Sequence, residues 1–333
     1  MKKLQKKDLP RFLAELKKQA TVYVPVDNDG LTQFAVWEEG TEPALDKNTI
    51  ISPKKIFFPQ TEELYAYETK KLQAAVQELD GVGGPTVVVG IRPCDVKAIE
   101  LLDDVFLAKG FEDIYYKKKR EETVLVSLGC LQPEPSCFCS SWGIDPGRAP
   151  QADIMMADTG DAFLLSAQSE KGEKLLQATQ SLLADTSQEF PEGKECSLQV
   201  EVEGLTEKLQ KMFEHPVWEE ICRKCINCGT CTYLCPTCHC FDILNRNRGE
   251  KGVKYRCYDS CMYKEYTLMA GGHNPRPTKK ERVRQRFLHK LQYMPERYEK
   301  WGCVGCGRCL VKCPVTLDIT RVINQLREVP IHD

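Results

Sequence analysis

The sequence lacks several features that would place it in common classes of protein. No apolar run is long enough to cross a bilayer, so we expect no membrane-spanning helix. The first ten residues contain no apolar core segment, and we therefore expect no secretory signal. The formal charge is only −2 over 333 residues, so the overall charge does not favour binding to nucleic acid or to an anionic membrane.

A nucleotide-binding loop is also missing. The glycine-rich segment Gly81–Gly84 follows an expected helix, precedes an expected strand and does not match G-x-G-x-x-G. A dinucleotide site needs its glycines after a strand and at the start of a helix. We therefore interpret these glycines as a helix stop. The sequence offers no motif for NAD and no P-loop.

Cysteine, by contrast, is abundant. The chain has 18 cysteines and no expected export signal. This combination argues against a disulfide scaffold and for thiolates that bind metal in a reducing compartment. We therefore expect a cytoplasmic protein. An anaerobic host is also expected, because metal–thiolate clusters are often sensitive to oxygen.

Eight of the cysteines fall in two runs with the same spacing. Each run has the form C-x2-C-x2-C-x3-C-P, closed by Pro236 in the first and Pro314 in the second. This repeat is the signature of bacterial ferredoxins with two [4Fe–4S] clusters, in which the fourth cysteine of each run ligates the cluster of the other run. The predicted ligands are Cys225, Cys228, Cys231 and Cys313 for the first cluster and Cys303, Cys306, Cys309 and Cys235 for the second.

Two other kinds of metal site use related spacings. Zinc ribbons contain paired C-x2-C knuckles, but they need four sulfurs per ion and not two runs of four closed by proline. Cys231, Cys235 and Cys238 match the radical-SAM spacing. That match overlaps a complete ferredoxin run and leaves the second run unexplained. We therefore favour two [4Fe–4S] clusters over zinc or radical-SAM chemistry.

The residues before the first run predict an α/β domain. Caps and helical spacing of apolar residues predict helices at residues 8–18, 62–79, 95–107, 171–183, 205–215 and 218–223. Apolar runs predict two buried strands, Thr86–Ile91 and Thr123–Leu128, with more β structure at residues 21–26, 31–37, 153–156 and 162–166. The polar segment 184–195 is interpreted as a linker. The predicted fold class is α+β: an α/β domain at 1–195 and a two-cluster ferredoxin-like domain at 196–333, with a long insertion at 236–302.

Another group of cysteines follows the two predicted buried strands. Cys94 lies just after the first strand, and the others follow the second strand: Cys130, Cys137 and Cys139. If the strands are neighbours in one sheet, the four thiols converge at its carboxyl edge, where α/β folds place ligands. Four sulfurs suit a third [4Fe–4S] cluster, but their spacing is equally compatible with free or zinc-bound thiols.

The insertion carries further cysteines and a basic segment. Cys238, Cys240 and Cys261 are candidates for a further metal site, although thiols that simply pack around the clusters are the plainer interpretation. Residues 276–300 contain nine Lys/Arg against three Asp/Glu. Their aromatic residues are too sparse for a base-stacking platform. We interpret this segment as a basic face that shields cluster charge or binds an acidic partner.

Several short motifs occur together in an order that resembles one family, the iron–sulfur β subunits of soluble NiFe sulfhydrogenases, to which a comparable iron–sulfur protein of anaerobic sulfite reductase also belongs. The motifs are Arg92-Pro-Cys-Asp95, Cys137-Phe-Cys139, Cys235-Pro-Thr-Cys238-His-Cys240-Phe, Asp259-Ser-Cys261, Gly271-Gly-His-Asn-Pro-Arg276-Pro and Cys303-Val-Gly-Cys306-Gly-Arg-Cys309. The resemblance implies a third cluster at Cys94, Cys130, Cys137 and Cys139. It leaves the role of Cys238, Cys240 and Cys261 open. Three cysteines lie outside these motifs and are interpreted as ordinary thiols: Cys196, Cys222 and Cys257.

The resemblance implies an electron-transfer subunit without catalytic residues of its own. Its partners would be a diaphorase subunit that binds flavin and NAD(P)H and a catalytic or hydrogenase-type subunit. Cluster potentials depend on local charge, hydrogen bonds and burial, so Arg308 and Lys312 are predicted to raise the potential of the second cluster. A different class of function is an enzyme that acts on a small substrate at Cys238, Cys240 and Cys261 with His273. Nucleic-acid binding by the basic segment ranks last.

Overall fold

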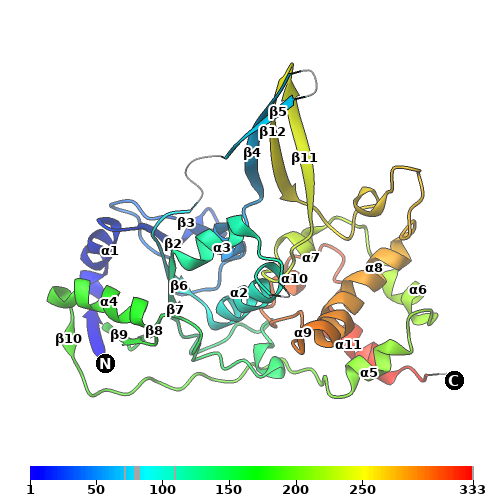
Figure 1. Cartoon of the computed structure of the whole chain (residues 1–333). Coiled ribbons are helices and arrows are strands. Elements are labelled where there is room, and N and C mark those ends of the chain that lie inside the picture. Colours follow the sequence, from blue (N-terminus) through cyan, green and yellow to red (C-terminus); the bar gives the residue numbers. More distant parts are fainter. Residues whose placement is uncertain (71–72, 79–82, 109, 332–333) are drawn as a thin grey trace. The chain divides into compact units, whose positions relative to one another are not determined.

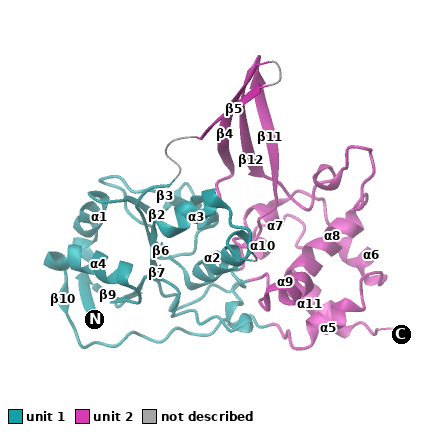
Figure 2. Ribbon diagram, in the orientation of Figure 1, with its two compact units in different colours: residues 1–57, 83–199, 304–306 teal, residues 58–82, 200–303, 307–333 magenta. Residues whose placement is uncertain are grey.

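The computed structural model describes residues 1–70, 73–78, 83–108 and 110–331, and the chain divides into two compact units (Figures 1 and 2). Unit 1 comprises residues 1–57, 83–199 and 304–306, and unit 2 comprises residues 58–82, 200–303 and 307–333. The sequence predicts a single boundary between residues 195 and 196. The compact units instead interleave along the chain. Residues 58–82 group with the insertion, and a three-residue turn of the second ferredoxin run groups with unit 1.

Unit 1 is built on a mixed sheet with the strand order β10-β1-β9-β8-β7-β6-β2-β3. Its centre is parallel: β2 pairs with β6, β6 with β7, and β7 with β8. Antiparallel strands extend both sides. The strands are β1 (Lys2–Gln5), β2 (Thr21–Asn28), β3 (Leu31–Val36), β6 (Thr86–Ile91), β7 (Thr123–Leu128), β8 (Ile154–Asp158), β9 (Ala162–Ala167) and β10 (Ala184–Asp185).

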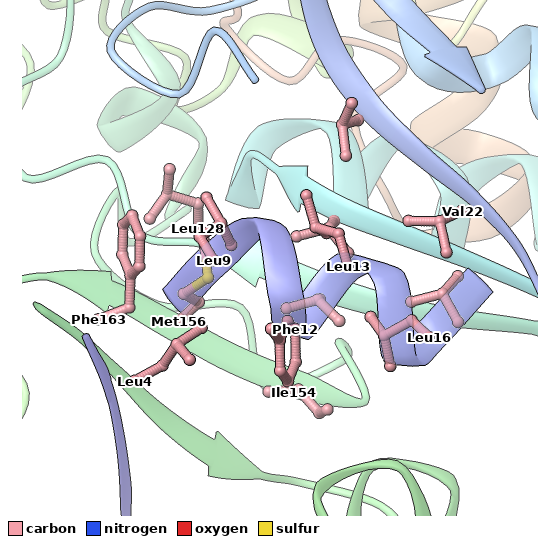
Figure 3. Close-up of a cluster of buried hydrophobic side chains, with 14 of the residues drawn as sticks. Leu4, Leu9, Phe12, Leu13, Leu16, Val22, Leu128, Ile154, Met156 and Phe163 are labelled. Atoms are coloured by element: carbon pink, nitrogen blue, oxygen red, sulfur yellow. The ribbon is translucent and has the colours of Figure 1, made fainter. Parts of the chain in front are cut away.

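Helices cover both faces of this sheet. On one side lie α1 (Leu9–Lys17) and α4 (Glu170–Ala178), and on the other lie α2 (Pro93–Phe106) and α3 (Ile114–Glu121) (Figure 1). Apolar residues at helical spacing on α1 place Phe12, Leu13 and Leu16 against the strands (Figure 3). Phe12 and Leu13 are fully buried, and each such side chain stabilises the fold by about 1.5–3 kcal/mol. The core that holds the sheet in place therefore lies mainly between α1 and the strands.

Unit 2 combines short helices with an antiparallel sheet of order β11-β12-β4-β5. A buried ion pair joins Glu62 of β4 to Arg256 of β12 at 2.6 Å, and the Arg256 guanidinium lies over the ring of Phe58. The strands are β4 (Thr61–Lys70), β5 (Gln73–Glu78), β11 (Phe241–Arg248) and β12 (Lys251–Tyr258). The helices are α5 (Leu205–Gln210), α6 (Val217–Cys222), α7 (Thr230–Tyr233), α8 (Lys279–Leu288), α9 (Met294–Tyr298), α10 (Arg308–Val311) and α11 (Ile319–Glu328).

The α+β class is confirmed, and the two predicted buried strands coincide with β6 and β7. The helix predicted at residues 62–79 is wrong, because this segment forms β4 and β5. Tyr65, Tyr67 and Thr69 favour a strand, and the strand that pairs with them, β12, lies almost two hundred residues away in the insertion. The helix expected to start at an Asp95 cap begins at Pro93 instead. The helix stop predicted at 81–84 falls partly on residues 81–82, which lie outside the described residues.

Candidate metal centres

The two ferredoxin runs adopt the same local backbone. In each run the residues on both sides of the second cysteine have positive φ: Asn227 (56°) and Gly229 (75°) in the first, Gly305 (61°) and Gly307 (74°) in the second. A short helix starts after each of these glycines and carries the third cysteine of its run. The two helices, α7 and α10, contact each other. This repeated geometry fits the wrapping of three closely spaced thiolates around one face of a cubane.

Backbone N–H groups already point at ligand sulfurs. Asn227 N–H donates to Cys225 Sγ at 3.4 Å, and Leu317 N–H donates to Cys313 Sγ at 3.2 Å. Both cysteines are predicted ligands of the first cluster. Hydrogen bonds of this kind stabilise the thiolate form and tune the potential of a bound cluster. The first cluster's predicted ligands therefore have the supporting contacts that such a site needs.

Lys290 is a buried cation beside a ligand of the second cluster. It lies in a π-helical turn (His289–Tyr293), and its Nζ donates to Cys235 Sγ at 3.2 Å. The same Nζ donates to Thr237 Oγ1 and to the carbonyl of Gly302, both at 2.9 Å. Burial disfavours the ammonium charge, but the surrounding cysteine sulfurs, Cys235 first among them, raise the pKa of Lys290 well above its usual range. Lys290 is thus a permanent positive charge at this ligand.

Arg286 is a second buried cation among the cysteines of unit 2. Its side chain is 3% exposed, and its Nε has no hydrogen-bond partner among the described residues. Burial opposes its charge, yet nearby cysteine sulfurs outweigh that cost and raise the pKa of Arg286. These cysteines are Cys231, Cys309, Cys238 and Cys235. A buried charge needs an oppositely charged partner, and thiolates that ligate an anionic cluster supply one.

Other cations of the basic segment also point inward. Arg282 and Arg284 are buried, and Arg284 pairs with Glu214 at 3.1 Å while its guanidinium covers the ring of Phe213. A buried guanidinium cannot form a solvent-exposed face for nucleic acid. The arrangement therefore agrees with the interpretation that this segment shields cluster charge. The two cations predicted beside the second cluster differ, since Arg308 is buried and Lys312 is exposed.

In unit 1 the N-terminal cysteine group lines a single cavity. The strands β6 and β7 are parallel neighbours, with Val88 paired to Leu125, so both end at the same edge of the sheet. The first turn of α2 carries the first cysteine after β6, and the loop after β7 carries the others. The cavity measures about 280 Å³, and its walls include Arg92, Lys47 and the cysteines Cys94, Cys130, Cys137 and Cys139. Parallel pairing thus brings together thiols from separate loops.

The protein alone keeps these thiols protonated. Burial, aided by the charge of Glu134, raises the pKa of Cys137 to about 12. Burial likewise raises the pKa of Cys139, and it raises that of Cys130 although the Arg92 charge works against it. Thiolate is the form that binds metal, so a bound metal has to displace these protons. Four soft sulfur donors around one cavity suit iron–sulfur or zinc chemistry.

Two cysteines that the sequence did not assign to this group also lie here. Cys196 Sγ is 3.5 Å from Cys139 Sγ, and Cys306 of the second ferredoxin run lines the cavity. The N–H of Cys196 donates to Ser140 Oγ at 3.0 Å. Cys196 lies 57 residues beyond Cys139, so no local spacing connects them. Its interpretation as an ordinary thiol therefore missed a contact with a predicted ligand.

The third candidate group, in the insertion, is less complete. A hydrogen bond from Cys261 lowers the pKa of Cys240 to about 6 despite burial, and Tyr266 contributes a further hydrogen bond. His273 is exposed. Within the residues that the structure describes, no three His, Cys, Asp or Glu side chains are arranged to hold a single metal ion. A further metal site at Cys238, Cys240 and Cys261 therefore stays a prediction.

The repeated cysteine turns, with their N–H···S bonds and buried cations, define the class of protein: a dicluster [4Fe–4S] protein that transfers electrons. Residues 224–317 match the family described as 4Fe-4S dicluster domain. Over 337 aligned residues, the chain is 33% identical to sulfhydrogenase 2 subunit beta of Pyrococcus furiosus, with 98% of both chains covered. The chain belongs to this family of iron–sulfur β subunits, and the predicted resemblance is confirmed.

Two further comparisons complete this description. No solved structure matches the chain. Among the described residues, no helix is both long and apolar enough to span a membrane.

Proposed function

We propose that the chain relays single electrons within a hydrogenase-type complex, between a diaphorase subunit that binds flavin and NAD(P)H and a catalytic subunit. The observation that carries this proposal is end-to-end similarity to a sulfhydrogenase β subunit together with a dicluster domain. The similarity extends over unit 1 as well as over the ferredoxin runs, so the relative shares more than a cluster-binding module. A cytoplasmic location is part of the proposal, because free thiolates need a reducing compartment.

The proposed ligands are the eight cysteines of the two runs. A bound [4Fe–4S] cluster supplies reversible one-electron chemistry. The first set is Cys225, Cys228, Cys231 and Cys313, and the second is Cys303, Cys306, Cys309 and Cys235. The matched positive-φ turns and the N–H···S bonds support this assignment.

The chain's own side chains set the electrostatics of these sites. Lys290 holds a positive charge 3.2 Å from Cys235 Sγ, and Arg286 is buried among several predicted ligands. Positive charge and hydrogen bonds at the sulfurs favour the more negative, reduced state. Both cations therefore raise the potential at which an electron is accepted. We assign no catalytic residue to this chain.

A third cluster at Cys94, Cys130, Cys137 and Cys139 is part of the proposal. These cysteines line one cavity of about 280 Å³ at the carboxyl edge of the sheet, where α/β folds bind their ligands. The contact of Cys196 with Cys139 adds a weak S–H donor beside one ligand. With three sites, the chain would be a longer relay than a two-cluster ferredoxin.

A second candidate function is chemistry on a small substrate at Cys240 and Cys261, with Cys238. The observation that favours it is the side-chain hydrogen bond between Cys240 and Cys261, outside the ferredoxin runs. Cys240→Ser separates the two functions. Loss of substrate reduction by the complex, with NAD(P)H still bleaching all clusters, would support this candidate. Unchanged substrate reduction would eliminate it.

The relay proposal is tested on the complex itself. We expect tagged chain, purified from its host without oxygen, to bring along a flavoprotein and a catalytic subunit. NAD(P)H should then bleach the visible absorbance of the chain's clusters, and the catalytic subunit's electron acceptor should restore it. A chain that purifies alone, or whose clusters NAD(P)H never reduces in the complex, would overturn the proposal.

A further inference from the structure

The turn Val304–Cys306 has two memberships. By sequence it is the middle of the second ferredoxin run, and by contact it belongs to unit 1. The Gly305 carbonyl accepts the N–H of Phe138 at 2.8 Å. The Cys137 thiol donates to the Cys306 carbonyl at 4.0 Å. Both contacts are made to the loop that carries two of the proposed N-terminal ligands.

Only glycine fits at position 305. A Cβ built there would lie 2.5 Å from the backbone N of Cys139 and 2.5 Å from the backbone C of Phe138. Backbone atoms cannot move aside as a flexible side chain does, so a larger residue would push the loop away.

The first run shows that the backbone conformation alone does not demand this glycine. The equivalent residue there is Asn227, whose φ of 56° is close to the 61° of Gly305. Asparagine tolerates this left-handed conformation better than most residues. The two runs thus share a backbone but differ in a side chain at the position where the second meets the Cys137–Cys139 loop. The absent side chain at 305 serves close approach.

We propose that the turn Val304–Cys306 joins the N-terminal cysteine group to the second ferredoxin run, which makes this run, and not the first, the neighbour of the N-terminal cluster site. This inference rests on the proposed third cluster. Cys306 is a predicted ligand of the second run and also lines the N-terminal cavity. Cys303 and Cys309 lie three residues from it, a chain length that spans at most about 10 Å. No residue of the first run belongs to unit 1.

Magnetic interaction between reduced clusters tests this order. Cys228→Ala removes the first-run site and Cys309→Ala removes the second-run site, each in the full chain. With Cys228→Ala, we expect spin–spin splitting in the electron paramagnetic resonance spectrum that disappears when Cys94→Ala is added. With Cys309→Ala, we expect the N-terminal signal to lose that splitting. Splitting that survives Cys309→Ala and is lost in Cys228→Ala would overturn the inference.

A matched pair of substitutions tests the turn itself. Gly305→Asn gives the second run the residue of the first, and Asn227→Gly makes the reverse change. We expect Gly305→Asn to abolish the splitting between the N-terminal and second-run signals, and Asn227→Gly to leave it unchanged. A wild-type spectrum for Gly305→Asn would contradict the role of the turn.

Iron content separates the two levels of the argument. About eight irons in the wild-type chain would remove the third cluster and with it the basis of this inference. About twelve irons with the opposite pattern of splitting would leave the third cluster standing and refute only its proposed neighbour.

Discussion

The two ferredoxin runs and the N-terminal cysteine group assemble their thiols in opposite ways. In each run, three cysteines lie within seven residues and are oriented by two positive-φ residues around the second one. In unit 1, the thiols come from the start of α2 and from the loop after β7, and only the parallel pairing of β6 with β7 brings them to one cavity. The first kind of site depends on local backbone, and the second depends on an entire folded sheet.

This difference makes distinct demands on the surrounding protein. The runs need charge compensation, which Arg286 and Lys290 provide from the insertion. The N-terminal group needs the core under the sheet, where α1 packs against the strands. Each dependence can be broken separately.

The largest expected effect is the loss of one whole site. We expect Cys139→Ala to lower the iron content from about twelve to about eight per chain, because a [4Fe–4S] cluster holds four irons and needs its four ligands. Cys196→Ala is the matched control, since Cys196 Sγ lies only 3.5 Å from Cys139 Sγ but is not a proposed ligand. Iron and acid-labile sulfide analysis measures both. Equal losses for the two variants would show that the ligand set is misassigned.

The next effect concerns the core beneath the N-terminal group. Phe12→Ala leaves a cavity at a fully buried position and should lower the free energy of unfolding of unit 1 by about 3–5 kcal/mol. On heating, we expect this variant to release about a third of its iron to a chelator before the rest, while the wild-type chain does so at a higher temperature.

A control on the other unit sharpens this test. Leu326 on α11 is fully buried in unit 2, and Leu326→Ala should cost about 2–5 kcal/mol. The order of iron release should then be reversed, with the larger fraction leaving first. If both variants released iron in the same order, the two sites would not depend on separate cores.

The smallest expected effect is a change of potential without loss of iron. Lys290→Met removes an N–H···S bond to Cys235 and a buried positive charge. It should lower the potential of the second-run cluster by on the order of 60 mV, which is a tenfold shift in a one-electron equilibrium. Lys312→Met, an exposed cation of the same run, should change it much less because solvent screens its charge. A redox titration followed by electron paramagnetic resonance compares them, and equal shifts would refute the role of Lys290.

The local part of this architecture could be predicted from the sequence, because spacing and helix or strand period are local properties. The repeat of four cysteines and the strands β6 and β7 are examples. The failures involve distant partners. The segment 62–79 becomes β-structure because β12 pairs with it. Lys290 meets Cys235 across 55 residues. No local pattern encodes such pairings, which arise only when the chain has folded.

The most direct test of the central claim is the iron, acid-labile sulfide and zinc content of the wild-type chain, purified and kept without oxygen. Three proposed cubanes predict about twelve irons and about twelve sulfides per chain, without stoichiometric zinc. About eight irons would contradict the third site in unit 1. Zinc in place of iron would contradict the electron-transfer assignment as a whole.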